Sequence, residues 1–207
     1  MDMQCRRFIY EQGGRDRMII CFDIDNTIND LAEKTLALYN AHTGKNIQMS
    51  DITTYNFYDC LSKEDADGII ALFKDKDLWN SLKPLPHSQE TLKKLVKQGH
   101  RILLATATDP INFEWKCDWL SRYFNFIPTD NIIRIMDKSL LKIDVMVDDH
   151  LSNLTSNICE RVCLDYPWNR DTSKEYAFDI KRAYNWNDIV NILNNIERKI
   201  KQWERDI

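Results

Sequence analysis

The chain has 207 residues and a formal net charge of −4, with 43% hydrophobic and 29% charged residues. This composition is typical of a globular protein, and so small a charge excludes the strong electrostatic attraction that binding to nucleic acid or to an anionic membrane requires. The longest apolar runs hold about six residues, against the roughly 20 that a membrane-spanning helix needs. The length predicts one domain with a large insertion, or two small domains, and leaves a homodimer open.

The cysteines indicate free thiols. Six of them are scattered along the chain, none forms a Cys-x-x-Cys pair, and Cys159 and Cys163 have no histidine at zinc-ligand spacing. Buried thiols in a reducing compartment are therefore favoured over a metal site. No apolar stretch of signal-peptide length follows Met1, so a cytoplasmic protein is expected.

The first predicted strand follows a polar segment. Residues 1–17 contain Gly13-Gly14 and lack periodicity, which predicts a flexible N-terminal extension. The character of the chain changes at Met18. The run 18–22 is apolar and ends in acidic residues, as expected of a strand that is buried on both faces.

Helices and strands alternate in the second half of the chain. A helix is predicted from Ser88 to the glycine stop at Gly99, and the strand 101–105 follows it, ending at Thr106. The later patterns predict a helix over 112–124, strands over 131–135, 145–147 and 161–164, and an amphipathic helix over 188–203. This alternation is typical of an α/β fold in which helices flank a parallel sheet.

The stretch 30–84 interrupts the alternation. Helical patterns occupy 31–42, 63–73 and the surroundings of Trp79, which is more chain than one crossover helix needs. We therefore expect a small helical domain of residues 30–84 inserted after the first strand. The core domain is then formed by residues 18–29 and 85–207.

Acidic pairs follow two of the predicted strands. Asp23 and Asp25 come after the first strand, and Asp148 and Asp149 come after 145–147. Ligands of an open parallel sheet bind beyond the carboxyl ends of its strands, so we expect these four carboxylates in one region. They would repel one another without a cation, and an oxygen-rich pocket of this kind suits Mg²⁺, which also accepts a phosphate group. All four are predicted to take part in a magnesium site.

Three further residues fit a phosphate site. Thr106 ends the second strand, where its hydroxyl and the N–H group of Ala107 are placed to hold a phosphate oxygen. Lys138 precedes the acidic strand and is a candidate to neutralise another oxygen.

Each of these features has a simpler alternative. Asp148 or Asp149 could cap a helix over 151–158, Thr106 could lie in a solvated turn, and Lys138 could be a surface lysine. The combination predicts phosphoryl chemistry, where each residue alone would not.

The same residues carry a family resemblance. The run Asp23-Ile24-Asp25-Asn26-Thr27 resembles the first motif of the haloacid dehalogenase superfamily, Asp-x-Asp-x-Thr/Val after a buried strand, and Thr106, Lys138 and Asp148-Asp149 match its other three motifs in order. Asn26 stands where some members carry glycine, and the second motif reads Thr-Ala-Thr in place of Thr-Ser-Pro. Residues 18–193 resemble the 5′(3′)-deoxyribonucleotidase branch and its bacterial relatives, most clearly in the segments 82–86, 114–120, 137–149 and 164–170.

The resemblance implies a Rossmann-like core, with residues 30–84 as a helical cap, and a magnesium-dependent phosphatase. Asp23 would be the nucleophile that forms an aspartyl-phosphate, and Asp25 would act as acid and base. The phosphate would be held by Thr106, Ala107 and Lys138.

The expected substrate is a small phosphomonoester, and the resemblance favours a nucleoside monophosphate. Tyr58, Trp79 and Lys116 are candidate substrate contacts, whereas packing is favoured for Trp168 and for aromatic residues of the cap in general. The alternatives are a phosphatase for another monoester, such as a sugar phosphate or phosphoglycolate, and a binding protein that keeps the fold without catalysis.

Overall fold

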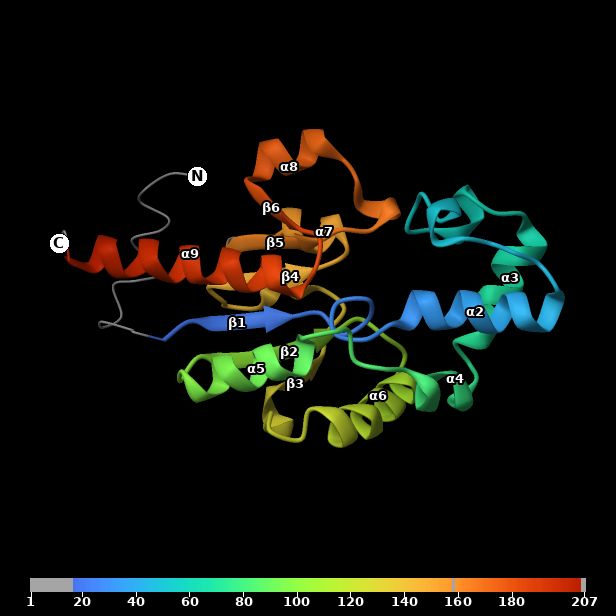
Figure 1. Ribbon diagram of the computed structural model, residues 1–207, viewed down its shortest axis with the longest axis horizontal. Coiled ribbons are helices and arrows are strands. Elements are labelled where there is room, and N and C mark those ends of the chain that lie inside the picture. Colours follow the sequence, from blue (N-terminus) through green and yellow to red (C-terminus); the bar gives the residue numbers. More distant parts are fainter. Residues whose placement is uncertain (1–16, 158, 206–207) are drawn as a thin grey trace.

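The computed structural model describes residues 17–157 and 159–205, and its centre is a six-stranded parallel sheet (Figure 1). The strands are β1 (Ile19–Phe22), β2 (Arg101–Thr106), β3 (Ile132–Arg134), β4 (Val145–Asp148), β5 (Glu160–Leu164) and β6 (Ile180–Ala183). They lie in the order β3-β2-β1-β4-β5-β6, so β1 is central and pairs with both β2 and β4. The predicted α/β fold is confirmed. The predicted N-terminal extension lies, apart from Arg17, outside the described residues.

Eight α-helices are found in the described part of the chain. Those of the inserted stretch are α2 (Leu31–Thr43), α3 (Lys63–Leu72) and α4 (Lys76–Ser81). Those that follow it are α5 (Ser88–Lys97), α6 (Pro110–Tyr123), α7 (Leu151–Thr155), α8 (Thr172–Phe178) and α9 (Trp186–Arg205). Short 3₁₀ turns lie between the helices and strands: η1 (Met49–Asp51), η2 (Phe57–Asp59), η3 (Thr129–Asn131), η4 (Lys138–Leu140) and η5 (Pro167–Asn169).

Both faces of the sheet are covered by apolar clusters. Successive side chains of a strand point to opposite faces, so neighbouring residues of β1 belong to different clusters. Ile20 and Phe22 belong to the larger apolar cluster, which also contains side chains of α5, α6 and α9. Cys21 belongs to a second cluster, with Leu151 and Leu154 of α7. The apolar run of β1 is thus a strand buried on both sides, as its sequence predicts.

The inserted helices lie beyond the carboxyl ends of the strands, at the right of Figure 1. They have a small apolar cluster of their own, built on Leu36, Tyr39, Ile52 and Ile69. Other apolar residues of the insert join the larger cluster of the core: Leu31, Leu78, Trp79 and Leu82. The insert is therefore packed onto the core as well as within itself.

The chain leaves and re-enters the core at one place. Asn29 and Pro84 form an isolated antiparallel bridge. The N–H group of Asp30 donates to the carbonyl of Lys83 at 3.1 Å, and the N–H group of Lys83 donates to the Asp30 carboxylate at 2.7 Å. The two connections to the insert are thereby tied together.

Among the described residues, no helix is long and apolar enough to cross a membrane. The cysteines in this part of the chain are free thiols, as predicted: Cys21, Cys60, Cys117, Cys159 and Cys163.

Candidate active site

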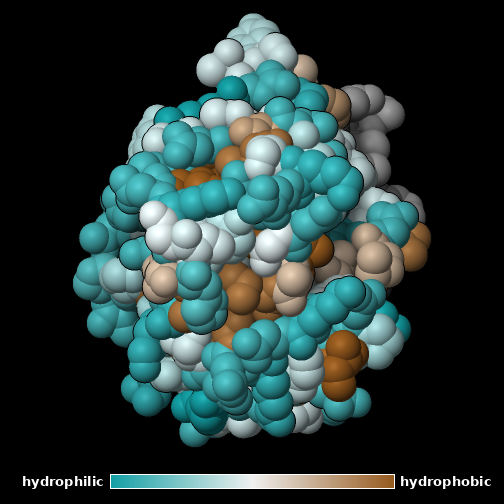
Figure 2. Space-filling view, turned by 90° about the vertical axis from the view of Figure 1, so that its right-hand side faces the viewer, coloured by the Kyte–Doolittle hydropathy of each residue, from teal (hydrophilic) through white to brown (hydrophobic). Residues whose placement is uncertain are grey.

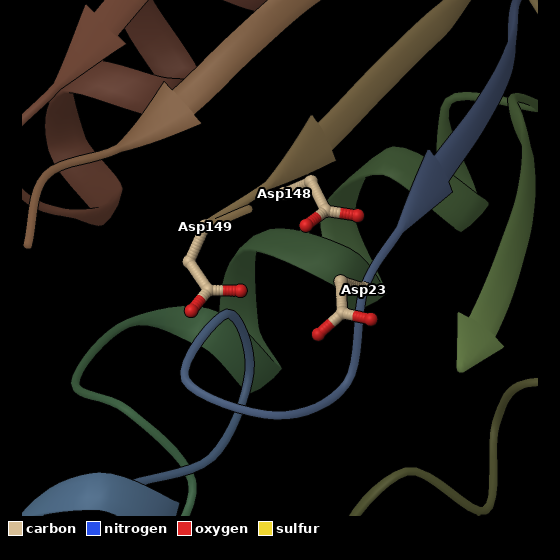
Figure 3. Close-up of side chains that lie close together, drawn as sticks. All are labelled: Asp23, Asp148 and Asp149. Atoms are coloured by element: carbon tan, nitrogen blue, oxygen red, sulfur yellow. The ribbon is translucent and has the colours of Figure 1, made fainter. Parts of the chain in front are cut away.

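Neighbouring strand ends bring three carboxylates together. Asp23 directly follows β1, Asp148 ends β4 and Asp149 is the next residue, and the two strands are hydrogen-bonded neighbours. One carboxylate oxygen of each residue lies within 4.8 Å of the others, and all three residues are buried. Figure 3 shows the three side chains converging from the ends of the two strands.

Lys138 supplies positive charge to this triad. It is buried in η4, and its Nζ donates hydrogen bonds to Asp23 Oδ1 and, at 2.7 Å, to Asp148 Oδ2. Its carbonyl accepts a hydrogen bond from the Asn157 side chain at 2.9 Å. Within the described part of the chain, hydrogen bonds to the Asp23 carboxylate reach only Oδ1, so Oδ2 remains available to a ligand.

The pKa values of the triad reflect crowded negative charge. Burial raises the pKa of Asp23 to about 7, and repulsion from Asp148 and Asp25 adds to this against the attraction of Lys138. The pKa of Asp149 is also raised well above its ordinary value, first by burial and then by Asp23 and Asp148. Burial opposes the charge of Lys138, but Asp148 and Asp23 outweigh it and raise the pKa of this lysine.

Asp25 stands apart from the triad and pairs with Lys116 of α6. Lys116 Nζ donates to Asp25 Oδ2 at 2.5 Å and to Thr106 Oγ1 at 2.8 Å. The lysine is buried, and Nζ lies 5.1 Å from the centre of the Trp79 ring. The other Asp25 oxygen accepts a hydrogen bond from the Asn29 side chain at 3.2 Å. The Lys116 head group thus connects Asp25 to the end of β2.

Asn26 closes the turn after the two aspartates. Its φ of 55° lies in the left-handed region, which glycine adopts freely and asparagine tolerates. This accounts for asparagine at a position where some relatives of the superfamily carry glycine. Its Oδ1 accepts a hydrogen bond from the Ala32 N–H group at 2.7 Å, which joins the turn to α2.

The simpler alternative for Asp148, a helix cap, is not what the structure shows, because the N-cap of α7 is His150, but Asp148 does contact the start of this helix. Its Oδ1 accepts hydrogen bonds from the His150 N–H group at 2.8 Å and from the Asn153 side chain at 3.2 Å. Its Oδ2 accepts one from Lys138. One carboxylate therefore supports the helix and the triad together.

Two residues that hold Asp149 were not predicted as site residues. Trp168 Nε1 donates to Asp149 Oδ2 at 3.1 Å, and the Asn169 side chain donates to the Asp149 carbonyl at 2.8 Å. Both come from η5, after β5. A tryptophan and an asparagine about twenty positions from the motif carry no local signal of this role, and packing was favoured for Trp168.

Two cavities share four lining residues: Asp25, Asn26, Tyr55 and Ala107. The first has a volume of about 380 Å³ and contains the carboxylate triad, Lys138 and Thr106. The second has a volume of about 230 Å³ and lies between insert and core, with mainly apolar walls that include Leu31, Leu36, Ile52, Phe57, Ile69, Phe73, Trp79 and Trp168. Figure 2 shows apolar residues within a hollow of this end of the molecule, surrounded by hydrophilic ones.

The candidate contacts from the insert occupy different places. Trp79 is buried, lines the apolar cavity and donates from Nε1 to the Phe73 carbonyl at 3.0 Å. Tyr58 is exposed, donates its hydroxyl to Asp67 at 2.6 Å, and is absent from the walls of both cavities. Tyr55 lines both cavities, and its ring stacks on His150 with 3.8 Å between centroids.

The side chains fit a hard divalent cation. All the candidate donors of the triad are carboxylate oxygens, which such cations prefer. When ionised, the four aspartates carry twice the charge of their two lysine partners, Lys116 and Lys138. Three of these aspartates are buried and Asp25 is half-buried, so an excess of two negative charges is costly here unless a cation compensates it.

Known proteins resemble the chain over most of its length. A family model described as "5' nucleotidase, deoxy (Pyrimidine), cytosolic type C protein" matches residues 17–200. A 5'(3')-deoxyribonucleotidase of Bacillus subtilis is 28% identical over 174 residues, which cover 84% of this chain and 96% of the relative.

Solved structures show the same fold. A hydrolase from Pseudomonas syringae matches with a TM-score of 0.59 at 16% identity, over 87% of this chain and 99% of that one. A haloacid dehalogenase-like family protein from Streptococcus pneumoniae matches with a TM-score of 0.58 at 12% identity, over 86% and 99% of the two chains.

Proposed function

The chain belongs to the family of the 5' nucleotidase, deoxy (pyrimidine), cytosolic type C protein, and on that premise we propose that it removes phosphate from nucleoside monophosphates with the help of Mg²⁺. The chain is an enzyme that hydrolyses phosphoric monoester bonds. The name of the Bacillus subtilis relative supports a deoxyribonucleotide as the substrate.

One observation carries the proposal: Asp23, Asp148, Asp149 and Lys138 line the same cavity beyond the carboxyl ends of β1 and β4. A phosphate group in this cavity would meet a carboxylate with an oxygen available for attack and a lysine beside it. The adjoining apolar cavity offers room for the group that the phosphate leaves.

Asp23 is the proposed nucleophile. Its Oδ2 attacks phosphorus, an aspartyl-phosphate forms, and the bond from phosphorus to the leaving oxygen breaks. Asp25, as the carboxylic acid, gives that oxygen a proton. When water attacks the aspartyl-phosphate, Asp25 takes a proton from it, the bond between phosphorus and Asp23 Oδ2 breaks and inorganic phosphate leaves, so that both aspartates return to their starting state. Lys116 holds the Asp25 carboxylate in place for both transfers.

The phosphate oxygens have separate partners. Lys138 and the Thr106 hydroxyl stabilise charge on them, together with the N–H group of Ala107. Asp23, Asp148 and Asp149 are the side chains that would hold magnesium, with Asp25 beside them. When bound, the ion supplies the positive charge that lets an anionic nucleophile approach an anionic phosphate.

The walls of the apolar cavity support a nucleoside as the leaving group. Trp79, Phe73 and Phe57 present aromatic surface there, on which a base can stack. Thr35, Thr54 and Asn112 add a small number of polar groups, as is usual where a mostly apolar pocket orients its ligand. A sugar phosphate offers no flat apolar surface for these walls.

A panel of phosphomonoesters tests the substrate. Release of phosphate in Mg²⁺ should be fastest from deoxynucleoside monophosphates, with glycerol phosphate, a hexose phosphate and phosphoglycolate well below them. A preference for phosphoglycolate or a hexose phosphate would overturn the nucleotide part of the proposal and leave the phosphatase part standing.

The Asp23→Asn variant tests the nucleophile. We expect turnover to fall by about 10⁴-fold or more, because the amide cannot form the covalent intermediate. The melting temperature in EDTA should stay at or above that of the wild type, since a buried charge is removed. Asp130→Asn, a change at an exposed site, is the control. Full activity of Asp23→Asn would contradict the assignment.

A further inference from the structure

Trp168 lines the apolar cavity and also contacts Asp149, a carboxylate that lines the other cavity. Its Nε1–H group donates to Asp149 Oδ2 at 3.1 Å. Its ring forms part of the wall of the apolar cavity and packs against the cluster of Leu36, Tyr39 and Ile52 in the insert. It is thus a core residue in contact with the carboxylate triad, with the insert and with the apolar cavity, which we call the leaving-group cavity from here on.

The hydrogen bond from Trp168 distinguishes the two oxygens of the Asp149 carboxylate. In the described part of the chain, donors reach only Oδ2, namely Trp168 at 3.1 Å and, more distantly, the Asn26 side chain at 3.5 Å. Oδ1 is left without a protein donor. Because hydrogen bonds to one oxygen fix the rotation of a carboxylate, Oδ1 is held ready for a cation.

The backbone under Trp168 is anchored to the same region. Asn169 donates to the carbonyls of Asp149 and Leu164, each at 2.8 Å. Arg182 of β6 donates to the Asn169 side chain at 2.8 Å and to its carbonyl at 2.9 Å. The ring of Tyr166 stacks on the indole of Trp168 with 4.3 Å between centroids and 6° between the rings. The indole is therefore held from several directions.

We propose that Trp168 is a positioning residue that couples the leaving-group cavity to the metal-binding carboxylate Asp149. A flat leaving group seated against the indole stabilises the position in which its N–H group already holds Asp149 for the metal. A substrate with a small leaving group gains nothing from this contact. The inference rests on the proposed function in that the cation is magnesium and the favoured leaving group is a nucleoside.

Two variants separate the roles of the indole. Trp168→Phe keeps a flat ring and removes the N–H donor, whereas Trp168→Leu removes both. The matched control is Trp119→Phe, because Trp119 is also buried and donates from Nε1 to a carbonyl, that of Leu82, at 3.0 Å. Each whole protein is stripped of metal, checked by circular dichroism and titrated with Mg²⁺ in a calorimeter without substrate.

We expect Trp168→Phe to bind Mg²⁺ about 10- to 100-fold more weakly, the usual effect of losing a group that orients a metal ligand, and Trp119→Phe to bind it like the wild type. At saturating Mg²⁺, Trp168→Leu should raise KM for a deoxynucleoside monophosphate at least tenfold over Trp168→Phe. KM for glycerol phosphate should be the same in both. Magnesium affinity of Trp168→Phe within twofold of the wild type would overturn the inference, and so would equal KM changes for the two substrates.

The wild-type protein gives a test that needs no variant to fold. The indole N–H resonance of Trp168 should move when Mg²⁺ saturates the site, and that of Trp119 should not. An unmoved Trp168 resonance at saturation would overturn the inference alone. Absence of any magnesium binding by the wild type would instead overturn the proposed function, and the inference with it.

Discussion

The ionised form of Asp149 is unfavourable in the folded protein unless a cation lies beside it. Its pKa is raised first by burial and then by the neighbouring aspartates Asp23, Asp148 and Asp25, against the attraction of Lys138. A carboxyl group whose pKa is raised on folding favours the folded state at low pH, where it is protonated, and this contribution is lost as the pH rises through the folded-state pKa. As the pH rises above the ordinary pKa of an aspartate, Asp149 therefore costs the metal-free protein a growing amount of stability.

We expect Asp149→Asn to melt a few degrees above the wild type in EDTA at pH 8, because the amide keeps a hydrogen-bond acceptor for Trp168 and removes the charge. The difference should shrink toward pH 4. In saturating Mg²⁺ the order should reverse, since only the wild type gains binding energy from the ion. Thermal melts at the two pH values, with and without Mg²⁺, check this. A variant less stable than the wild type in EDTA at pH 8 would contradict it.

The sequence was informative for residues that follow a strand. The positions of Asp23 and Asp148 depend only on where β1 and β4 end, and parallel strands put their carboxyl ends at one edge. Trp168 and Asn169 could not be found in this way, because their contacts with Asp149 span 19 and 20 positions through a turn of no regular pattern. Tyr58 was predicted as a substrate contact, but its hydroxyl donates to Asp67 and it lines neither cavity. The sequence does not show which way an aromatic side chain of the insert points.

At the scale of elements, periodic segments were predicted well and charged ones were not. The predicted helix over 31–42 and the strand over 145–147 differ from α2 and β4 by one residue each. The strand β6 and the helix α8 were not predicted. β6 is an edge strand that carries Lys181 and Arg182, whose head groups pair with acidic side chains such as Glu160 and Glu175, so it lacks the apolar run of a central strand.

The contact between α2 and α3 depends on the glycine at position 68. A Cβ atom there would lie 2.5 Å from Cε2 of Tyr39, whose ring is buried and whose hydroxyl donates to Asp65 at 2.6 Å. With any larger residue at this position, either the Tyr39 ring or the spacing of the two helices would have to shift.

We expect Gly68→Ala to destabilise the protein by about 1–3 kcal/mol, the usual cost of overpacking, although alanine is the better helix former. Because the insert forms the wall of the apolar cavity, KM for a nucleotide should rise more than kcat falls. Urea unfolding and steady-state kinetics check both. A variant more stable than the wild type would contradict this, because the Tyr39 ring would then move aside without loss of stability.

At the scale of the whole molecule, insert and core share apolar contacts. Leu31, Leu78, Trp79 and Leu82 belong to the same cluster as Phe22 of β1. The cluster whose buried residues all come from the insert is much smaller, and Trp168 of the core packs against it. A division into two domains in sequence is therefore not a division into two independent cores.

We expect the protein to unfold in one cooperative transition, with Trp and far-UV signals coinciding and calorimetric and van't Hoff enthalpies equal. Mg²⁺ at 100 times its Kd should stabilise the molecule by about 2.7 kcal/mol. Differential scanning calorimetry with and without Mg²⁺ measures both. Two separate transitions, of which only one responded to Mg²⁺, would show that the insert unfolds by itself.

The bridge between Asn29 and Pro84, where the chain leaves and re-enters the core, has a consequence for how the family evolves. Since both ends of the insert meet at one point, the stretch between them can lengthen, shorten or be exchanged while the loop that carries Asp23 and Asp25 keeps its shape. Mutations that change which leaving group is preferred can then accumulate in the helices of the insert without loss of catalytic activity. A lineage built on this plan can acquire new substrates by altering about a quarter of its chain, and related proteins are expected to diverge fastest there.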